Sequence, residues 1–144
     1  QNLILRGFKS SEVHAIKMTR IMDGGPIFSS RRISLRGNAS AIFKRIERSV
    51  WELIVEVCEE SPVPVPQVGL VTVFKRLTAT DNIIKKNMSL EEIYHRIRMV
   101  DSDDYSKAYL EFGNKKLEFS MARFKNGTLT ANVKIIGNQD SKGM

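Results

Sequence analysis

The sequence contains very few of the residues that build redox centres and metal sites. Its 144 residues include one cysteine and two histidines. A single cysteine excludes an internal disulfide and indicates a reducing compartment rather than a secretory one. Cys58 lies within an apolar helical pattern, so we predict that it packs in the core. With only His14 and His95 as further soft ligands, we predict neither a metal site nor a cofactor.

Several motifs and segments are also missing. Neither GxGxxG nor GxxxxGK[ST] occurs, so no glycine-rich loop for phosphate binding is expected. No apolar run approaches the roughly 20 residues of a membrane-spanning helix, and no signal peptide is visible. The acidic run at 101–104 lacks the glycine and closing glutamate of a calcium loop, so we expect a solvated turn. No constellation of catalytic residues is apparent, which favours a protein that is not an enzyme.

Positive charge is the most informative property that the sequence does have. Lysine and arginine number 23 against 16 acidic residues, which gives a net charge of +7. Such an excess raises the local concentration of nucleic acid or anionic lipid, although single charge clusters are often only solvated faces. We predict an anionic partner bound by the following basic residues. They are Arg31, Arg32, Arg36, Lys44, Arg45, Arg48, Lys75, Arg76, Lys85, Lys86, Arg96 and Arg98.

The first half of the chain predicts a strand pair followed by a long helix. Residues 12–22 and 27–35 read as extended segments separated by the turn residues of 23–26. A helix is expected to begin at Asn38 or Ser40 and to stop before the Ser61–Pro62 pair, because proline disfavours a helical predecessor. Its apolar stripe recurs at helical spacing. The stripe comprises Ile42, Ile46, Val50, Leu53, Ile54 and Val57.

Three shorter features follow the long helix. The alternating prolines of 62–66 predict a stiff spacer, with a recognition motif as the alternative. The apolar run 68–74 predicts a central strand that is covered on both faces. Residues 78–88 read as irregular or as one short helical turn. Ser89 and Glu92 then form a capping box that starts a second helix.

The C-terminal third predicts a three-stranded meander. Apolar and polar residues alternate from 108 to 112, from 117 to 121 and from 129 to 135. The turns between them fall at Gly113–Asn114 and Asn126–Gly127, and Asn-Gly is the strongest two-residue hairpin signal. We therefore predict an α+β fold, an antiparallel sheet that includes this meander and packs with two helices. The predicted organisation is an N-terminal arm at 1–11, a single globular domain at 12–136 and a polar tail at 137–144.

The charge order of the long helix opposes its dipole. Lys44, Arg45 and Arg48 lie in the first turns and acidic residues crowd the end, at a cost of roughly 0.3–1 kcal/mol per misplaced charge. Either a binding role or intramolecular pairing explains this order. As a binding hypothesis, the acidic end meets a neighbouring copy, together with the N-terminal arm and the proline stretch. The predicted self-association residues are Leu5, Phe8, Pro62, Pro64, Pro66, Glu56, Glu59 and Glu60.

The order of these elements resembles the globular domain of rhabdovirus matrix proteins. The resemblance rests on the helix SAIFKRIERSVWELIVEV, the apolar segment VGLVTVFKRL and the meander KAYLEFGNKKLEFSMARFKNGTLTANVKI. It implies a structural protein that self-associates and bridges the nucleocapsid, a ribonucleoprotein, and the inner face of the membrane envelope. It also implies peripheral attachment to an anionic membrane surface. The expected location is the virion and the host cytoplasm or nucleus, without secretion.

An alternative function is an RNA- or DNA-binding domain of a larger ribonucleoprotein. Such a domain presents aromatic residues on a sheet face for base stacking. Phe112 and Phe119 fall on the apolar face that the meander needs for its core, and only Tyr109 and Phe124 point the other way. We therefore favour a non-enzymatic matrix-type protein with a homo-oligomer, nucleocapsid or RNA as partner and no small-molecule substrate.

Overall fold

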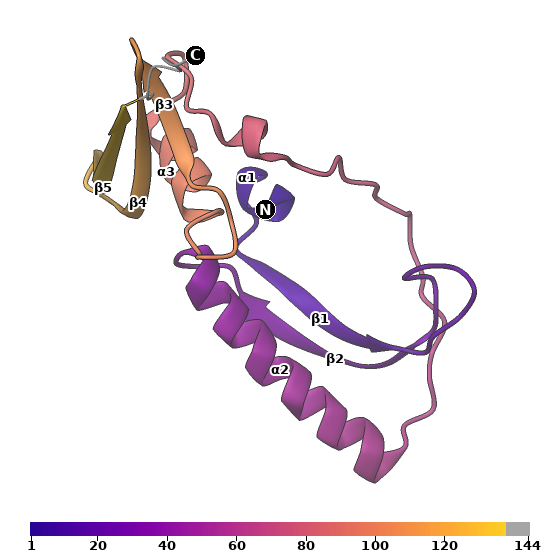
Figure 1. The fold of residues 1–144 in the computed structure, drawn as a ribbon. Helices are drawn as coiled ribbons and strands as arrows, with labels where there is room; N and C mark the ends of the chain where they lie inside the picture. Colours follow the sequence, from indigo (N-terminus) through magenta and orange to yellow (C-terminus); the bar gives the residue numbers. More distant parts are fainter. Residues whose placement is uncertain (138–144) are drawn as a thin grey trace, which may run out of the picture. The chain divides into compact units, whose positions relative to one another are not determined.

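The computed structural model describes residues 1–137 and confirms the predicted α+β fold (Figure 1). The strands form two antiparallel sheets, one of two strands and one of three. Residues 138–144 of the predicted tail lie outside the described residues. The elements are α1 (Asn2–Leu5), β1 (Ser10–Ile16), β2 (Ile27–Ser34), α2 (Ala39–Glu60), the 3₁₀ helix η1 (Ala79–Asn82), α3 (Leu90–Arg98), β3 (Ala108–Phe112), β4 (Lys115–Lys125) and β5 (Thr128–Gly137).

The chain divides into two compact units, each described by itself below. The hairpin–helix unit comprises Phe8–Arg36 and Ala41–Phe74. The C-terminal unit comprises Gln1–Gly7, Gly37–Ser40 and the chain from Lys75 onward. The prediction of a single domain over residues 12–136 stays a prediction.

The start of α3 in the C-terminal unit forms the predicted capping box. Ser89 Oγ accepts a hydrogen bond from the Glu92 amide at 3.2 Å, and Glu92 Oε2 accepts one from the Ser89 amide at 2.7 Å. The bond from the Ser89 amide is the main cause that lowers the pKa of Glu92. Farther along, Ile97 and Met99 are each 1% exposed and contribute to the core of this unit. Local sequence signals therefore place this helix correctly.

The meander β3–β4–β5 is also confirmed. Asn126 and Gly127 have φ values of 51° and 72°, the left-handed pair that a type I′ hairpin turn requires. Strand β4 carries a bulge between Ser120 and Arg123, where Met121 has φ 54°. Phe112, which we predicted to face the core, is 69% exposed because it lies at the end of β3, an outer strand of the sheet.

The acidic run after α3 is only in part the solvated turn that we predicted: Asp103 and Asp104 are exposed in a turn, but Asp101 is buried. Asp101 is 5% exposed, and its Oδ2 accepts hydrogen bonds from the Met121 amide at 2.9 Å and from Asn38 Nδ2 at 3.1 Å. Its carbonyl oxygen also accepts from the Ser40 amide. Asp101 is buried because it satisfies the backbone exposed by the β4 bulge and a backbone amide in the first turn of α2.

In the hairpin–helix unit, β1 and β2 pair from Ser10↔Ser34 to Ile16↔Ile27. Helix α2 ends at Glu60, as expected before Pro62, with Ser61 at φ 46°. Ile42 and Leu53 are buried, but Cys58 is exposed, so the prediction that it packs is wrong. The apolar stripe of α2 is wider than the surface that two strands cover.

The predicted central strand at 68–74 is absent, since residues 66–74 carry no regular strand. Only Val65 pairs with a strand, through reciprocal 2.8 Å backbone hydrogen bonds with Ile27. Val68 is 98% exposed and Leu70 is 100% exposed. The apolar run gives this segment the composition of a buried strand, but a strand also needs a neighbour to pair with, and none of the described strands lies beside it.

Candidate functional site

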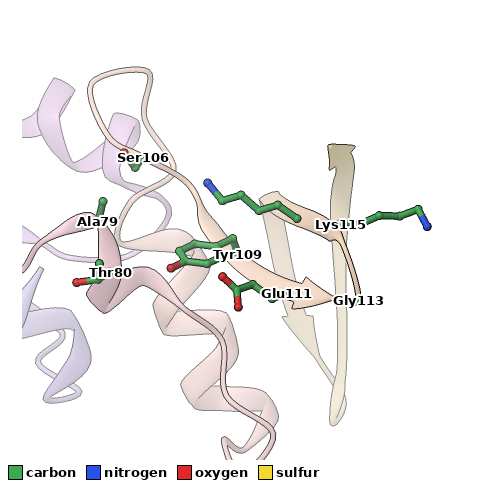
Figure 2. A pocket seen from close by; sticks show the side chains of 8 residues that line it. Ala79, Thr80, Ser106, Tyr109, Glu111, Gly113 and Lys115 are labelled. Atoms are coloured by element: carbon green, nitrogen blue, oxygen red, sulfur yellow. The ribbon is translucent and has the colours of Figure 1, made fainter. Parts of the chain in front are cut away.

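A polar pocket of ≈350 Å³ lies in the C-terminal unit, and Figure 2 shows it from close by. Segments that are well separated in the sequence form its walls: the start of η1, the residue Ser106, β3 and the turn into β4. The lining residues are Ala79, Thr80, Ser106, Tyr109, Glu111, Gly113, Lys115 and Lys116.

Backbone hydrogen bonds hold η1 beside β3. The Ile84 amide donates to the Tyr109 carbonyl at 2.7 Å, and Ile83 forms a parallel bridge with Tyr109. Asn82 is 5% exposed, and its Nδ2 donates to the Ser106 carbonyl at 2.7 Å. These contacts fix the two sides of the pocket relative to each other.

The start of η1 is held by a capping box of its own. Asp81 Oδ2 accepts from the Thr78 amide at 2.8 Å and from the Thr78 hydroxyl at 2.9 Å. The bond from the Thr78 amide is the largest cause that lowers the pKa of Asp81. The Thr80 hydroxyl lies 2.8 Å from the Thr78 hydroxyl, so the wall that Thr80 contributes is an ordered helix start.

The sheet positions the charged groups of the pocket. Lys116 Nζ lies 4.6 Å from the centroid of the Tyr109 ring and 2.8 Å from Glu118 Oε1. Tyr109 lies opposite Glu118 in the β3–β4 register, and Glu111 lies opposite Lys116, so all four share one face of the sheet. In Figure 2 the Tyr109 and Glu111 side chains extend to the same side of β3, whereas Lys115 points away from Tyr109.

The pocket offers groups for recognition rather than for reaction. Hydroxyl groups, a carboxylate and an ammonium can donate and accept hydrogen bonds to a polar ligand. No nucleophile is paired with a base among its lining residues. Among residues 1–137, no cluster of three or more His, Cys, Asp or Glu side chains is arranged to hold a metal ion. Over the same residues, no helix combines the length and apolar character that crossing a membrane requires.

Many of the basic residues predicted to bind an anion have partners within their own unit. Arg31 pairs with Glu52 and Glu56, and the pKa of Glu56 is lowered mainly by a hydrogen bond with Ser29 and also by Arg31. For Glu52 and Glu56, this pairing with Arg31 favours the intramolecular explanation of the charge order of α2 over a binding role. Arg32, Lys75, Arg45, Arg96 and Arg98 also donate to protein oxygens: Ser10 Oγ, Asp81 Oδ1, and the carbonyls of Arg36, Asp81 and Gly37, respectively.

The remaining predicted cations are exposed and are divided between the two units. Lys85 and Lys86 follow η1 in the C-terminal unit, whereas Lys44 and Arg48 lie on α2 in the other unit. Arg36 and Arg76 are exposed as well. Their role in binding an anion stays a prediction.

The predicted self-association residues are likewise divided between the two units. The start of the N-terminal arm forms α1, which buries Ile4 in the C-terminal unit and packs against α3, whereas residues 6–9 are exposed. Phe8 remains 52% exposed, and the proline stretch is held at one point by the Val65–Ile27 bridge. Glu59 and Glu60 are exposed, whereas Glu56 pairs with Arg31. Self-association through these residues stays a prediction.

The pocket residues were missed from the sequence, apart from one partial signal. Tyr109 was recognised as pointing away from the apolar face of the meander. Nothing in the sequence places it beside Thr80, because that contact depends on the parallel bridge from Ile83 to β3. A second signal was present but was not used: Lys115 and Lys116 directly follow the turn at 113–114.

Comparison with known proteins points to a family that the sequence patterns did not suggest. The family described as methionyl-tRNA formyltransferase, C-terminal domain, matches residues 79–136. A solved structure described as methionyl-tRNA formyltransferase from Clostridium thermocellum is similar to nearly the whole chain. It is 40% identical with a TM-score of 0.90 and covers 95% of this chain. This chain spans 61% of that protein's length.

More distant structures share the fold. Structures of HypX from Aquifex aeolicus, one of them in complex with tetrahydrofolic acid, cover 83% of this chain with TM-scores of about 0.7 at 16% identity. The chain spans 22–23% of their length. No curated protein matches the sequence.

These similarities correct the functional predictions. The resemblance to rhabdovirus matrix proteins is wrong, and with it the non-enzymatic assembly function, the nucleocapsid and membrane partners and the virion location. The prediction of a protein without enzymatic activity or a small-molecule substrate is wrong as well, since the similar proteins are formyltransferases. The matrix resemblance rested on the order and spacing of common elements, which unrelated proteins share, and not on residues of a site.

Proposed function

We propose that this chain is part of a formyltransferase and that its C-terminal unit recognises the acceptor substrate. One observation supports this most directly: a protein described as a methionyl-tRNA formyltransferase is 40% identical over 95% of this chain. The family match at residues 79–136 begins at the first residue of the pocket and includes all of its lining residues. The polar pocket is thus the best candidate on this chain for contact with a substrate.

In the proposed reaction, an amine of the acceptor attacks the carbon of the formyl group. A new bond forms between that nitrogen and the formyl carbon, while the bond from the formyl carbon to its carrier breaks. The proton that the amine loses ends on the carrier atom that leaves. Methionyl-tRNA is the acceptor suggested by the name of the similar protein, and tetrahydrofolate is a carrier suggested by the complex described for HypX.

The residues of the pocket are suited to recognising the acceptor substrate. Thr80 and Tyr109 present hydroxyl groups, and Glu111 presents a carboxylate that accepts hydrogen bonds from an amine or amide. Lys116, held by Glu118, supplies a fixed positive charge beside the ring. Exposed Lys85 and Lys86, in the same unit, are the predicted cations best suited to meet anionic groups of the acceptor.

The test measures formylation of methionyl-tRNA by the complete protein with a formyl derivative of tetrahydrofolate as donor. We expect Tyr109→Ala to raise the KM for the acceptor about five- to tenfold, with little change in kcat. Loss of a hydrogen bond worth about 1–1.5 kcal/mol corresponds to that factor. Tyr109→Phe separates the hydroxyl from the ring.

Phe112→Ala is the matched control, because Phe112 lies on the same strand and is 69% exposed but does not line the pocket. Its KM should equal that of the unmodified protein. Absence of formyl transfer would contradict the proposed activity. Equal KM values for Tyr109→Ala and Phe112→Ala would contradict the role of the pocket.

A further inference from the structure

The outward side of α2 carries a single stripe of residues whose charge changes sign along the helix. These residues, in chain order, are Lys44, Arg48, Trp51, Val55 and Glu59. Because they recur every three or four positions, they share one side of the helix, and we call them the outer stripe. The buried residue Leu53 lies on the opposite side. The outer stripe is therefore basic at one end, apolar in the middle and acidic at the other end.

The apolar middle of the outer stripe is open to solvent. Trp51 is 63% exposed and Val55 is 49% exposed. Both line a hollow of ≈640 Å³ whose other residues are Arg31 and glutamates near the end of α2. The outward side of a surface helix ordinarily carries polar residues, and tryptophan is among the residues most enriched at the centres of interfaces. The middle of the stripe therefore has the character of a contact surface.

The charged ends of the outer stripe are available to a partner. Among residues 1–137, Lys44, Arg48 and Glu59 take part in no ion pair. By contrast, Glu56, which lies beside the stripe, pairs with Arg31 of β2. The hairpin–helix unit thus pairs a charge beside the stripe and leaves the charges on the stripe to solvent.

A second copy of the chain presents the surface that matches the outer stripe. In an antiparallel pair of α2 helices centred between residues 51 and 52, Lys44 of each copy lies opposite Glu59 of the other copy. The two Trp51 side chains meet near the two-fold axis. A two-fold interface brings the same surface of both copies together, so that surface has to complement itself. The outer stripe does so, because opposite charges face each other at both ends and apolar groups meet between them.

The same pairing explains the charge order of α2, which opposes the dipole of its own helix. Helix α2 has no acidic residue in its first turn and no basic residue in its last turn. In an antiparallel pair, the start of one helix lies beside the end of the other. Lys44 then lies near a helix end, which favours a cation, and Glu59 lies near a helix start, which favours an anion. The charge order is therefore unfavourable in one copy and favourable in the pair.

We infer that two copies of this protein associate through their outer stripes in an antiparallel dimer. The stripe runs from residue 44 to residue 59, which is about 24 Å of helix at 1.5 Å per residue. A helix pair of this length is smaller than a standard interface of about 1,600 Å², so the dimer is reversible, with a Kd on the order of 10 μM. The inference goes beyond the proposed function, because association needs neither substrate nor formyl transfer.

Sedimentation velocity of the complete protein, over a concentration series from about 1 to 100 μM, measures the association. We expect the fraction of dimer to rise with concentration. We also expect the Kd to rise with salt, because exposed ion pairs are screened. A monomer at every concentration at low salt would overturn the inference.

Two charge-reversed variants identify the surface. Lys44→Glu places like charges opposite each other at both ends of the pair, and so does Glu59→Lys, so each variant alone should raise the Kd about tenfold or more. An equimolar mixture of the two restores an opposite-charge pair at both ends and should dimerise about as well as the unmodified protein. Lys125→Glu, at an exposed lysine of the other unit, is the matched control and should leave the Kd unchanged. A mixture that stays monomeric would overturn the antiparallel arrangement.

Trp51→Ala tests the apolar middle of the stripe. We expect it to raise the Kd about 30-fold, because truncating a tryptophan at the centre of an interface is among the most costly changes there. Phe112→Ala, which removes an aromatic ring that is 69% exposed in the other unit, is the matched control. An unchanged Kd for Trp51→Ala, together with a lower Tm at concentrations where the protein is monomeric, would show that another part of the same protein covers Trp51. That result would overturn the inference.

Discussion

Helices α2 and α3, the two longest among residues 1–137, satisfy their ends and faces in different ways. Helix α3 has a capping box, acidic residues in its first turn and basic residues in its last turn, all of which complement its dipole. Helix α2 has no acidic residue in its first turn and no basic residue in its last. It depends instead on other segments, such as Arg31 of β2 for its glutamates and Asp101 for its first turn. A short helix can thus be complete within its unit, while a longer one depends on its surroundings.

The two helices also differ in how far their apolar side chains are buried. Ile97 of α3 is 1% exposed, whereas Trp51 and Val55 of α2 are 63% and 49% exposed. The nearly complete burial of Ile97 means that contacts within the C-terminal unit stabilise α3. Helix α2, by contrast, presents apolar surface on both sides of its buried residue Leu53.

The largest expected effect is on the core of α3. Ile97→Ala should lower the free energy of unfolding by about 3–4 kcal/mol, because it removes buried methyl groups and leaves a cavity. Val55→Ala on α2 should cost less than about 1 kcal/mol, since its side chain is half exposed. Denaturant unfolding of both variants measures the difference. Similar losses would mean that α2 is covered on this side as fully as α3.

A smaller effect is expected at the start of α3. Ser89→Ala removes the acceptor for the Glu92 amide and should cost about 1 kcal/mol, the usual value of a helix cap. Asn87→Ala is the matched control, because Asn87 is exposed two residues earlier and lies outside the capping box. Denaturant unfolding that shows no difference between the two variants would contradict a capping role for Ser89.

The smallest effect is a dependence on pH that distinguishes the helices. The pKa of His95 in α3 is lowered from 6.5, mainly by burial and then by Arg98, whose Nε donates to His95 Nδ1. The unfolded chain therefore binds this proton more readily, so the contribution of His95 is complete above pH 6.5 and is lost as the pH falls toward the folded pKa. On α2, Glu56 has a lowered pKa, so its contribution is lost only below about pH 4.5.

Unfolding of the unmodified protein and of His95→Gln between pH 5 and 7.5 measures this dependence. We expect the stability of the unmodified protein to rise with pH across this range, and the slope to be smaller in the variant. Identical slopes would show that His95 titrates alike in the folded and unfolded states.

The parts of the fold that the sequence predicted correctly are those decided by neighbouring residues. The Ser89–Glu92 box, the Asn126–Gly127 turn and the helix end before Pro62 each depend on contacts within a few positions. The strand expected at 68–74 failed because a strand also needs a partner edge. The burial of Asp101 was missed because the β4 bulge that it satisfies lies 20 residues away.

The candidate site was harder to predict for the same reason. Thr80 and Tyr109 come together only through pairing between distant segments, and neither residue carries a recognisable motif. Most of the predicted binding arginines turned out to hold the fold, because a guanidinium readily satisfies carbonyls of neighbouring loops. Charge excess alone therefore suggested a partner class without locating a site.

The hydrogen bonds that Asp101 accepts have a consequence for the order in which the protein folds. Its bonds reach Asn38 and Ser40 across 63 and 61 positions of sequence, and Met121 across 20. Contacts of such long range require large loops to close, so they form after the local turns and helices are in place. The hydrogen bonds that connect the β4 bulge to the first turn of α2 therefore form together, late in folding. Weakening these hydrogen bonds of Asp101 should speed unfolding far more than it slows folding.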